Sequence, residues 1–180
     1  MQPIYFLTGP PAAGKSTLAK ALLQRFDHGY HIDVDSVRDA VASGMASNTP
    51  WTDETTRQFA LAEQAACDLA IRYNDADFAV AVVIDHCAGP PNLDKLIEER
   101  LQHRRVHKIA LAPSLDINLH RNRTRSTKEF DTSFLNKAIE RLNPHYTNEP
   151  IHEQGWIVFD NSGGDIEVDI EGLLARTIGS

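Results

Sequence analysis

A loop near the start of the chain has the residue types that bind nucleotide phosphates. Gly9-Pro-Pro-Ala-Ala-Gly14-Lys15-Ser16 matches the pattern GxxxxGK(S/T) at every fixed position, between an apolar run and a helical stretch. Glycines let backbone N–H groups turn toward phosphate oxygens, and the N-terminus of the following helix adds a partial positive charge. Lys15 can reach the β- and γ-phosphates, and the Ser16 hydroxyl can ligate Mg²⁺. The loop predicts a nucleoside triphosphate, bound by Gly9, Ala12, Ala13, Gly14, Lys15, Ser16 and Thr17.

Two aspartates and an arginine follow where a second strand is expected to end. Alternation along a strand would point Asp33 and Asp35 to the same side. In open parallel sheets, ligands gather beyond the carboxyl ends of the strands. A carboxylate near the γ-phosphate can take the proton of an acceptor hydroxyl, which is the role expected of Asp35. Asp33 and Arg38 are expected to contact the acceptor. The alternative is that Asp35 or Ser36 only caps the next helix.

A third aspartate ends the apolar run Val82-Val-Ile84-Asp85, which is the pattern of a Walker-B element. We expect Asp85 to hold Mg²⁺, together with Ser16, or else to contact the acceptor. The alternative is a turn residue at the end of a strand. The neighbouring His86 and Cys87 do not complete a set of four zinc ligands at a recognisable spacing.

An arginine-rich segment, His120 to Lys128, lies between two expected helices. Arg121 and Arg125 are four residues apart, so they project from the same helical face. As part of a lid over about 120–131, Arg125 would neutralise charge on the phosphoryl group in transfer, and Arg121 would bind the nucleotide. The alternative is a solvated basic loop, which is also the interpretation that we favour for the other basic cluster, Arg100 to Lys108.

The elements that must position these residues alternate along the chain. Apolar runs predict strands at 4–7, 30–34, 78–84, 106–112 and 156–159. Helices are predicted at about 15–26, 36–42, 52–73, 90–102, 114–125, 131–142 and 165–178, with Thr52 as a cap and Pro144 as a stop signal. Strands that alternate with helices imply a parallel sheet covered on both faces. The sequence therefore predicts one three-layer α/β domain over residues 1–180, with about five strands.

Composition narrows the class of protein further. The 180 residues include 18 Lys plus Arg and 25 Asp plus Glu, a net charge of −7, which gives no general attraction to nucleic acid or anionic lipid. No apolar run is long enough to span a membrane, and the N-terminus does not resemble a signal peptide. Two cysteines are too few for a disulfide scaffold. We expect a soluble cytoplasmic protein that makes no membrane contact.

These motifs, in this order, resemble the small P-loop kinases of the nucleoside-monophosphate-kinase-like group. Asp33-Val-Asp35 is similar to gluconate and shikimate kinases, Val34-Asp35-Ser36 to chloramphenicol phosphotransferases, and Asp35-Ser-Val-Arg38 with the arginine lid to the kinase half of phage polynucleotide kinase. The resemblance extends to the last strand, which ends Phe159-Asp-Asn-Ser162. It implies ATP and Mg²⁺, with Asp35 as general base. The fuller acceptor signature of gluconate kinases is not reproduced after Asp35.

The favoured function is therefore an ATP-dependent phosphotransferase. It would move the γ-phosphoryl group to a hydroxyl of a small molecule, such as a sugar acid, another metabolite or an antibiotic-like acceptor. A close alternative is a polynucleotide 5′-hydroxyl kinase, which needs a basic groove near Arg38 and the lid. An alternative of another class is a nucleotide-binding regulatory module with little transfer activity.

Overall fold

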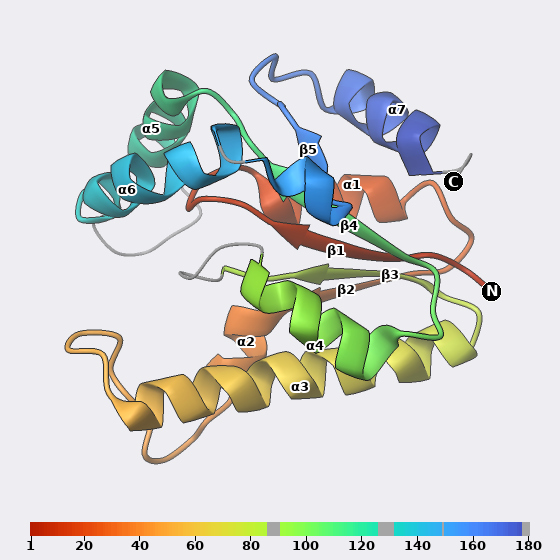
Figure 1. Cartoon of the computed structure of the whole chain (residues 1–180), viewed down its shortest axis with the longest axis horizontal. Helices are drawn as coiled ribbons and strands as arrows, with labels where there is room; N and C mark the ends of the chain where they lie inside the picture. Colours follow the sequence, from red (N-terminus) through yellow and green to blue (C-terminus); the bar gives the residue numbers. More distant parts are fainter. Residues whose placement is uncertain (86–90, 126–131, 149, 178–180) are drawn as a thin grey trace.

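A parallel sheet forms the centre of the computed structural model, which describes residues 1–85, 91–125, 132–148 and 150–177. In these residues the sheet has five strands in the order β2-β3-β1-β4-β5, and every pair is parallel (Figure 1). The strands are β1 (Ile4–Thr8), β2 (Gly29–Asp33), β3 (Ala79–Val83), β4 (Val106–Leu111) and β5 (Ile157–Phe159). The predicted fold class and strand count are confirmed.

Helices cover both faces of the sheet because its central strands are apolar on both sides. Every residue of β1 and β3 is buried. Ile4 and Phe6 of β1 join one core cluster, and Tyr5 and Leu7 join the other. The first cluster includes residues of α3 (Asp53–Asp75), α4 (Pro91–Leu101) and α6 (Leu135–Thr147); the second includes residues of α1 (Lys15–Leu23) and α7 (Ile166–Thr177).

The remaining elements are short or lie at the ends of strands. They are α2 (Val34–Asp39), α5 (Leu115–Thr124), which packs beside α6, and the 3₁₀ helix η1 (Ile151–Gln154). Thr52 caps α3 as predicted, in a reciprocal arrangement with Thr55. In the part of the chain that is described, no helix is long and apolar enough to cross a bilayer.

The junction of β2 and α2 differs from the sequence prediction. β2 ends at Asp33, and Asp35 already lies in the first turn of α2. The Asp33 carboxylate accepts a hydrogen bond of 3.1 Å from the backbone N–H of Asp35, so Asp33 is the N-cap, in place of Asp35 or Ser36. The prediction that Asp33 and Asp35 alternate along one strand is therefore wrong, because the cap starts the helix two residues early.

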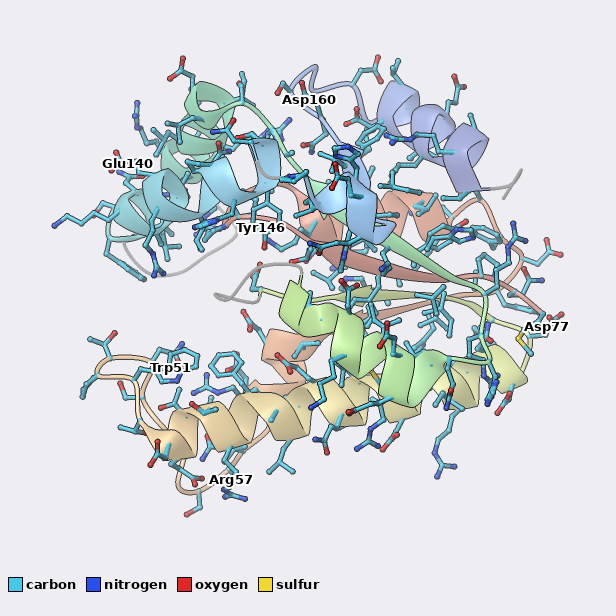
Figure 2. The ribbon with its side chains drawn as sticks, in the orientation of Figure 1. Trp51, Arg57, Asp77, Glu140, Tyr146 and Asp160 are labelled. Atoms are coloured by element: carbon cyan, nitrogen blue, oxygen red, sulfur yellow. The ribbon has the colours of Figure 1, made fainter. Side chains whose placement is uncertain are left out.

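Helix α6 also differs, since it continues through Pro144 to Thr147. A proline inside a helix removes one backbone hydrogen bond, so tertiary contacts must hold the last turn in place. Tyr146 is buried on the side of α6 that faces the sheet (Figure 2), and its hydroxyl shares a hydrogen bond of 3.2 Å with the Thr8 hydroxyl. Asn143 donates to the Pro113 carbonyl at 2.8 Å. The predicted start of this helix, Asp131, lies outside the described residues.

Candidate active site

The phosphate-binding loop lies at the carboxyl end of β1, where the order of the strands reverses direction. β2 and β3 lie on one side of β1, and β4 and β5 on the other. Such reversals are where parallel sheets bind ligands. Gly9 has φ +154°, and a Cβ there would lie 2.9 Å from the Leu111 carbonyl oxygen. Gly14 caps α1 with φ 93°. Both positions therefore require glycine.

Lys15 is held inside the loop. Its side chain is 5% exposed, and Nζ donates to the carbonyl oxygens of Gly9 and Pro10 at 2.9 Å each. The ammonium also forms an ion pair with the Asp85 carboxylate, which follows β3. This contact joins the loop to the predicted Walker-B residue.

A cavity of about 490 Å³, which we call the first cavity, opens beside the loop. It brings together most of the residues that the sequence predicts for the site. These are Ala12, Gly14, Lys15, Ser16, Thr17, Asp33, Asp35, Asp85, Arg121 and Arg125. Gly9 and Ala13 belong to the loop without lining the cavity.

Arg125 has a buried guanidinium with unused donors. Nε and Nη2 find no hydrogen-bond partner among the described residues. Burial lowers the pKa of Arg125, and the nearby Asp85 carboxylate partly opposes that shift. A desolvated cation with free donors beside a phosphate-binding loop is suited to receive an anionic oxygen. The rest of the expected lid, 126–131, lies outside the described residues.

A second cavity of about 930 Å³ adjoins the first. The two share four lining residues, namely Ala12, Asp35, Asp85 and Arg125. The second cavity then extends away from the loop between α3 and α6. Asp35 therefore lies where a compartment next to the phosphate loop meets a larger one.

Arg38 does not join this group. It lies in the last turn of α2, is 6% exposed, and donates to the Ala46 carbonyl. Its guanidinium carbon lies 4.4 Å from the centre of the Phe59 ring. Arg38 is not among the described residues that line either cavity. The structure thus places it behind the wall of the second cavity.

Three side chains from the second half of the chain donate hydrogen bonds to backbone carbonyls of the phosphate loop. Of these, the sequence predicted a role only for Arg121. Asn118 of α5 donates to the Pro11 carbonyl at 2.6 Å, and Asn161, after β5, donates to the Ala13 carbonyl at 2.8 Å. Arg121 contacts that Ala13 oxygen at 3.3 Å and the Asn161 oxygen at 2.7 Å. Sequence reasoning gave neither asparagine a role, although Asn161 lies in the quoted end of the last strand, because their partners are more than 100 residues away.

The first cavity also contains an aspartate that the sequence did not indicate. Asp169 of α7 is 8% exposed and lines the end of the cavity near Gly164 and Ile166. Burial raises the pKa of the Asp169 carboxyl, and the Arg121 charge partly offsets that shift.

The oxygen atoms in the first cavity fit Mg²⁺. Ser16, Asp33, Asp35 and Asp85 all line it, and no three of the described acidic residues, histidines or cysteines form a metal-binding cluster. Mg²⁺ prefers hard oxygen ligands, usually one or two carboxylates with substrate phosphates and water. Ser16 and Asp85 are thus suitable residues to hold the ion, as the sequence predicts.

Solved structures with the same fold were found. A tunicamycin resistance protein from Deinococcus radiodurans is 18% identical, with a TM-score of 0.67 over 98% of this chain and 95% of that one. A gluconokinase from Sinorhizobium meliloti 1021 is 19% identical, with a TM-score of 0.63 over 98% and 94%. A shikimate kinase from Bacteroides thetaiotaomicron is 19% identical, with a TM-score of 0.59 over 96% and 97%. At these identities the likeness shows the fold.

The sequence itself matches a known family. A profile described as an AAA domain matches residues 4–145, which include the phosphate loop, all three aspartates and both arginines of the lid. No curated protein matches the chain in sequence. Together with the kinases among the solved structures, the profile confirms the predicted resemblance to small P-loop kinases.

Proposed function

The chain belongs to the AAA domain family, and we propose that it is an ATP-dependent phosphotransferase that acts on a hydroxyl of a small molecule. One observation carries the proposal: the first and second cavities meet at Ala12, Asp35, Asp85 and Arg125. A transferase needs two substrates whose reacting atoms touch. A phosphate compartment that opens into a separate, larger cavity provides that arrangement.

The reaction follows from the residues at the junction. The acceptor hydroxyl oxygen forms a bond to the γ-phosphorus while the bond from that phosphorus to the β–γ bridging oxygen breaks, and ADP leaves. The hydroxyl proton passes to the Asp35 carboxylate. Lys15 and the loop N–H groups bind the phosphates, and Arg125 stabilises the charge on the transferring group. Bound Mg²⁺, held by Ser16 and Asp85, would neutralise charge on the β- and γ-phosphates.

The charges around the second cavity favour a small acceptor over a polynucleotide. Its lining has three carboxylates and two guanidiniums, from Asp35, Glu63, Asp85, Arg125 and Arg141. A site for a phosphate backbone requires an excess of cations. Arg38, which a polynucleotide kinase would use at the acceptor, is instead buried against Phe59.

A regulatory nucleotide-binding module would need only the first cavity. A screen for release of ADP from ATP, or of GDP from GTP, separates these functions. It is run with Mg²⁺ across neutral sugars, sugar acids, nucleosides, aminoglycosides and 5′-hydroxyl oligonucleotides. Transfer of γ-³²P from the nucleotide into a small acceptor supports the proposal. Nucleotide binding without transfer to any acceptor class would favour the regulatory module, and selective labelling of oligonucleotides would favour the polynucleotide kinase.

A further inference from the structure

We propose that the acceptor is an uncharged or cationic alcohol that carries an aromatic or other flat apolar ring, and that this ring packs against Trp51 in the second cavity. This inference rests on the proposed function and specifies the class of its acceptor. Four observations support it: the residues that form the cavity walls, the orientation of Trp51, the charges of the lining residues, and the volume of the cavity.

The second cavity lies between faces of two helices. Thr56, Phe59, Ala60 and Glu63 recur at three- and four-residue spacing on α3, so they share one helical face. The opposite wall is built in the same way from the start of α6, by Leu135, Ala138, Arg141 and Leu142. The junction with the phosphate loop closes one end. Most of the exposed lining is apolar. Asp35, Asp85 and Arg125 lie at the junction, and the other polar lining residues are Asn48, Thr49, Thr56, Glu63 and Arg141.

Trp51 is oriented by its neighbours before any ligand binds. Its indole N–H donates to the Thr56 hydroxyl at 2.8 Å, and its ring stacks on Phe59 with centroids 5.2 Å apart and an interplanar angle of 11°. Phe59 in turn packs against the Arg38 guanidinium. Figure 2 shows Trp51 on the loop before α3, on the side of that loop turned toward α6. The hydrogen bond and the stack together fix the indole in the cavity wall.

Two large apolar side chains are exposed at this cavity. Trp51 is 50% exposed, and Phe134, from the opposite wall, is 63% exposed. Exposure of an isolated apolar residue is ordinary, but two that line one cavity indicate a ligand surface. Stacking on a fixed indole needs a flat apolar partner, since aromatic rings prefer offset or edge contacts with other rings.

The lining has no excess of positive charge that would attract an anionic acceptor. Asp35, Glu63 and Asp85 outnumber Arg125 and Arg141 among the residues that line the cavity. Burial raises the pKa of Glu63 to about 7, so near neutral pH this carboxyl group is partly protonated and can donate as well as accept a hydrogen bond. A hydrogen-bond donor or a cation on the acceptor would pair with this carboxyl group.

The size of the space agrees with a ring-bearing alcohol. About 930 Å³ lies near the upper end of the range of roughly 300–1,000 Å³ for pockets that bind drug-sized molecules. A simple sugar acid would leave most of the apolar wall, including Trp51 and Phe134, in contact with water. A hydroxyl placed at Asp35 leaves room for a ring between α3 and α6.

Calorimetric titration of the unmodified protein tests the inference without requiring transfer. Two pairs of probes differ in the apolar or aromatic ring, namely phenyl β-glucoside against methyl β-glucoside and adenosine against ribose. Gluconate serves as a separate anionic probe. The ring-bearing member of a pair should bind about tenfold more tightly than its counterpart and than gluconate. Equal affinity within both pairs, or tightest binding of gluconate, would overturn the inference.

Variants then assign the effect to the indole. Trp51→Ala should remove the advantage of the ring-bearing probe, and Trp51→Phe should restore most of it. Leu61→Ala is a matched control, because Leu61 is an exposed apolar residue of α3 that does not line the cavity. An unchanged advantage in Trp51→Ala would refute the role of Trp51.

The two proposals fail in different ways. If ring-bearing alcohols bind through Trp51 but receive no phosphate, the phosphotransferase function is wrong and the ring site stands. If phosphate is transferred efficiently only to ring-free sugar acids, with the same KM in Trp51→Ala, the function stands and the ring site is wrong.

Discussion

The Lys15 ammonium and the Asp85 carboxylate form an ion pair that links the phosphate-binding loop to the residue after β3. Lys15 thus lies at the point where the central strand β1 meets β3, with its remaining donors on the Gly9 and Pro10 carbonyls. An anionic partner is already beside the ammonium, in the cavity where a phosphate is expected to bind. Because these three partners occupy the three donors of the ammonium, a phosphate oxygen would have to replace one of them. Replacement of Asp85 would leave its carboxylate available to an ion.

The first prediction concerns Lys15. Lys15→Ala removes the cation that is expected to contact the phosphates. We therefore expect the affinity for ATP to fall by about 100-fold, which corresponds to the loss of about one strong charge-assisted hydrogen bond. Calorimetric titration with ATP and Mg²⁺ measures the effect. Lys20→Ala is the control, because Lys20 is exposed on the same helix. Equal ATP affinity in the two variants would show that the loop does not use Lys15 for phosphate.

Arg125 is predicted to act on the reaction more than on binding. Its buried nitrogens Nε and Nη2 have no partner among the described residues, and they lie where the two cavities join. Arg125→Ala should therefore lower kcat by about 10³-fold or more, while the Kd for ATP changes by less than about tenfold. Arg123→Ala, on the exposed side of α5, should leave kcat unchanged. A kcat loss of the same size in both variants would contradict a specific role for Arg125.

Asn118 is predicted to stabilise the loop from a distance. Asn118→Ala leaves the Pro11 carbonyl without its donor, which should lower the free energy of unfolding by about 1–3 kcal/mol. Denaturant unfolding measures this loss, and ATP titration should show weaker binding by the same variant. His120→Ala, an exposed position two residues along α5, should change neither quantity. Full stability and full ATP affinity in Asn118→Ala would remove the residue from this role.

A pH dependence of stability is expected from Glu63. Burial raises the pKa of Glu63 from 4.5 to about 7, so between these values the folded protein holds a proton that the unfolded chain releases. The contribution of Glu63 is therefore present below about pH 4.5 and is lost as the pH rises to about 7. Relative to Glu63→Gln, the unmodified protein should lose on the order of 2 kcal/mol across this window, a value reduced for partial exposure.

Glu54 provides the control for that measurement. Hydrogen bonds from Arg57 and Gln58 lower the pKa of Glu54 to about 2, so its contribution is lost as the pH falls between about 4.5 and 2. Glu54→Gln should therefore show no change in relative stability between pH 5 and 7. A constant difference between Glu63→Gln and the unmodified protein over the same range would contradict the Glu63 assignment.

The strands and the phosphate loop could be predicted because their signals are local. The apolar run that contains β3 and the loop before α1 each carry their own pattern, and Thr52 marks the start of α3. The continuation of α6 beyond Pro144 could not be predicted. The last turn is held by a hydrogen bond between Tyr146 and Thr8, and these residues are 138 positions apart in the sequence. Likewise, nothing in the sequence near Arg38 indicates that Phe59 and Ala46 cover its guanidinium. The roles of the site residues stay predictions until variants are measured.

The most direct test of the account is the activity of Asp35→Asn. The substitution keeps the shape of the side chain but removes its ability to take a proton, and the helix cap at Asp33 is untouched. With an acceptor found by the ADP-release screen, turnover should fall by about 10²–10⁴-fold, while the Kd for ATP stays within about threefold. Asp39→Asn, an exposed position on the same helix, should behave like the unmodified protein. Unchanged turnover in Asp35→Asn would contradict phosphoryl transfer at the junction of the two cavities with Asp35 as the base.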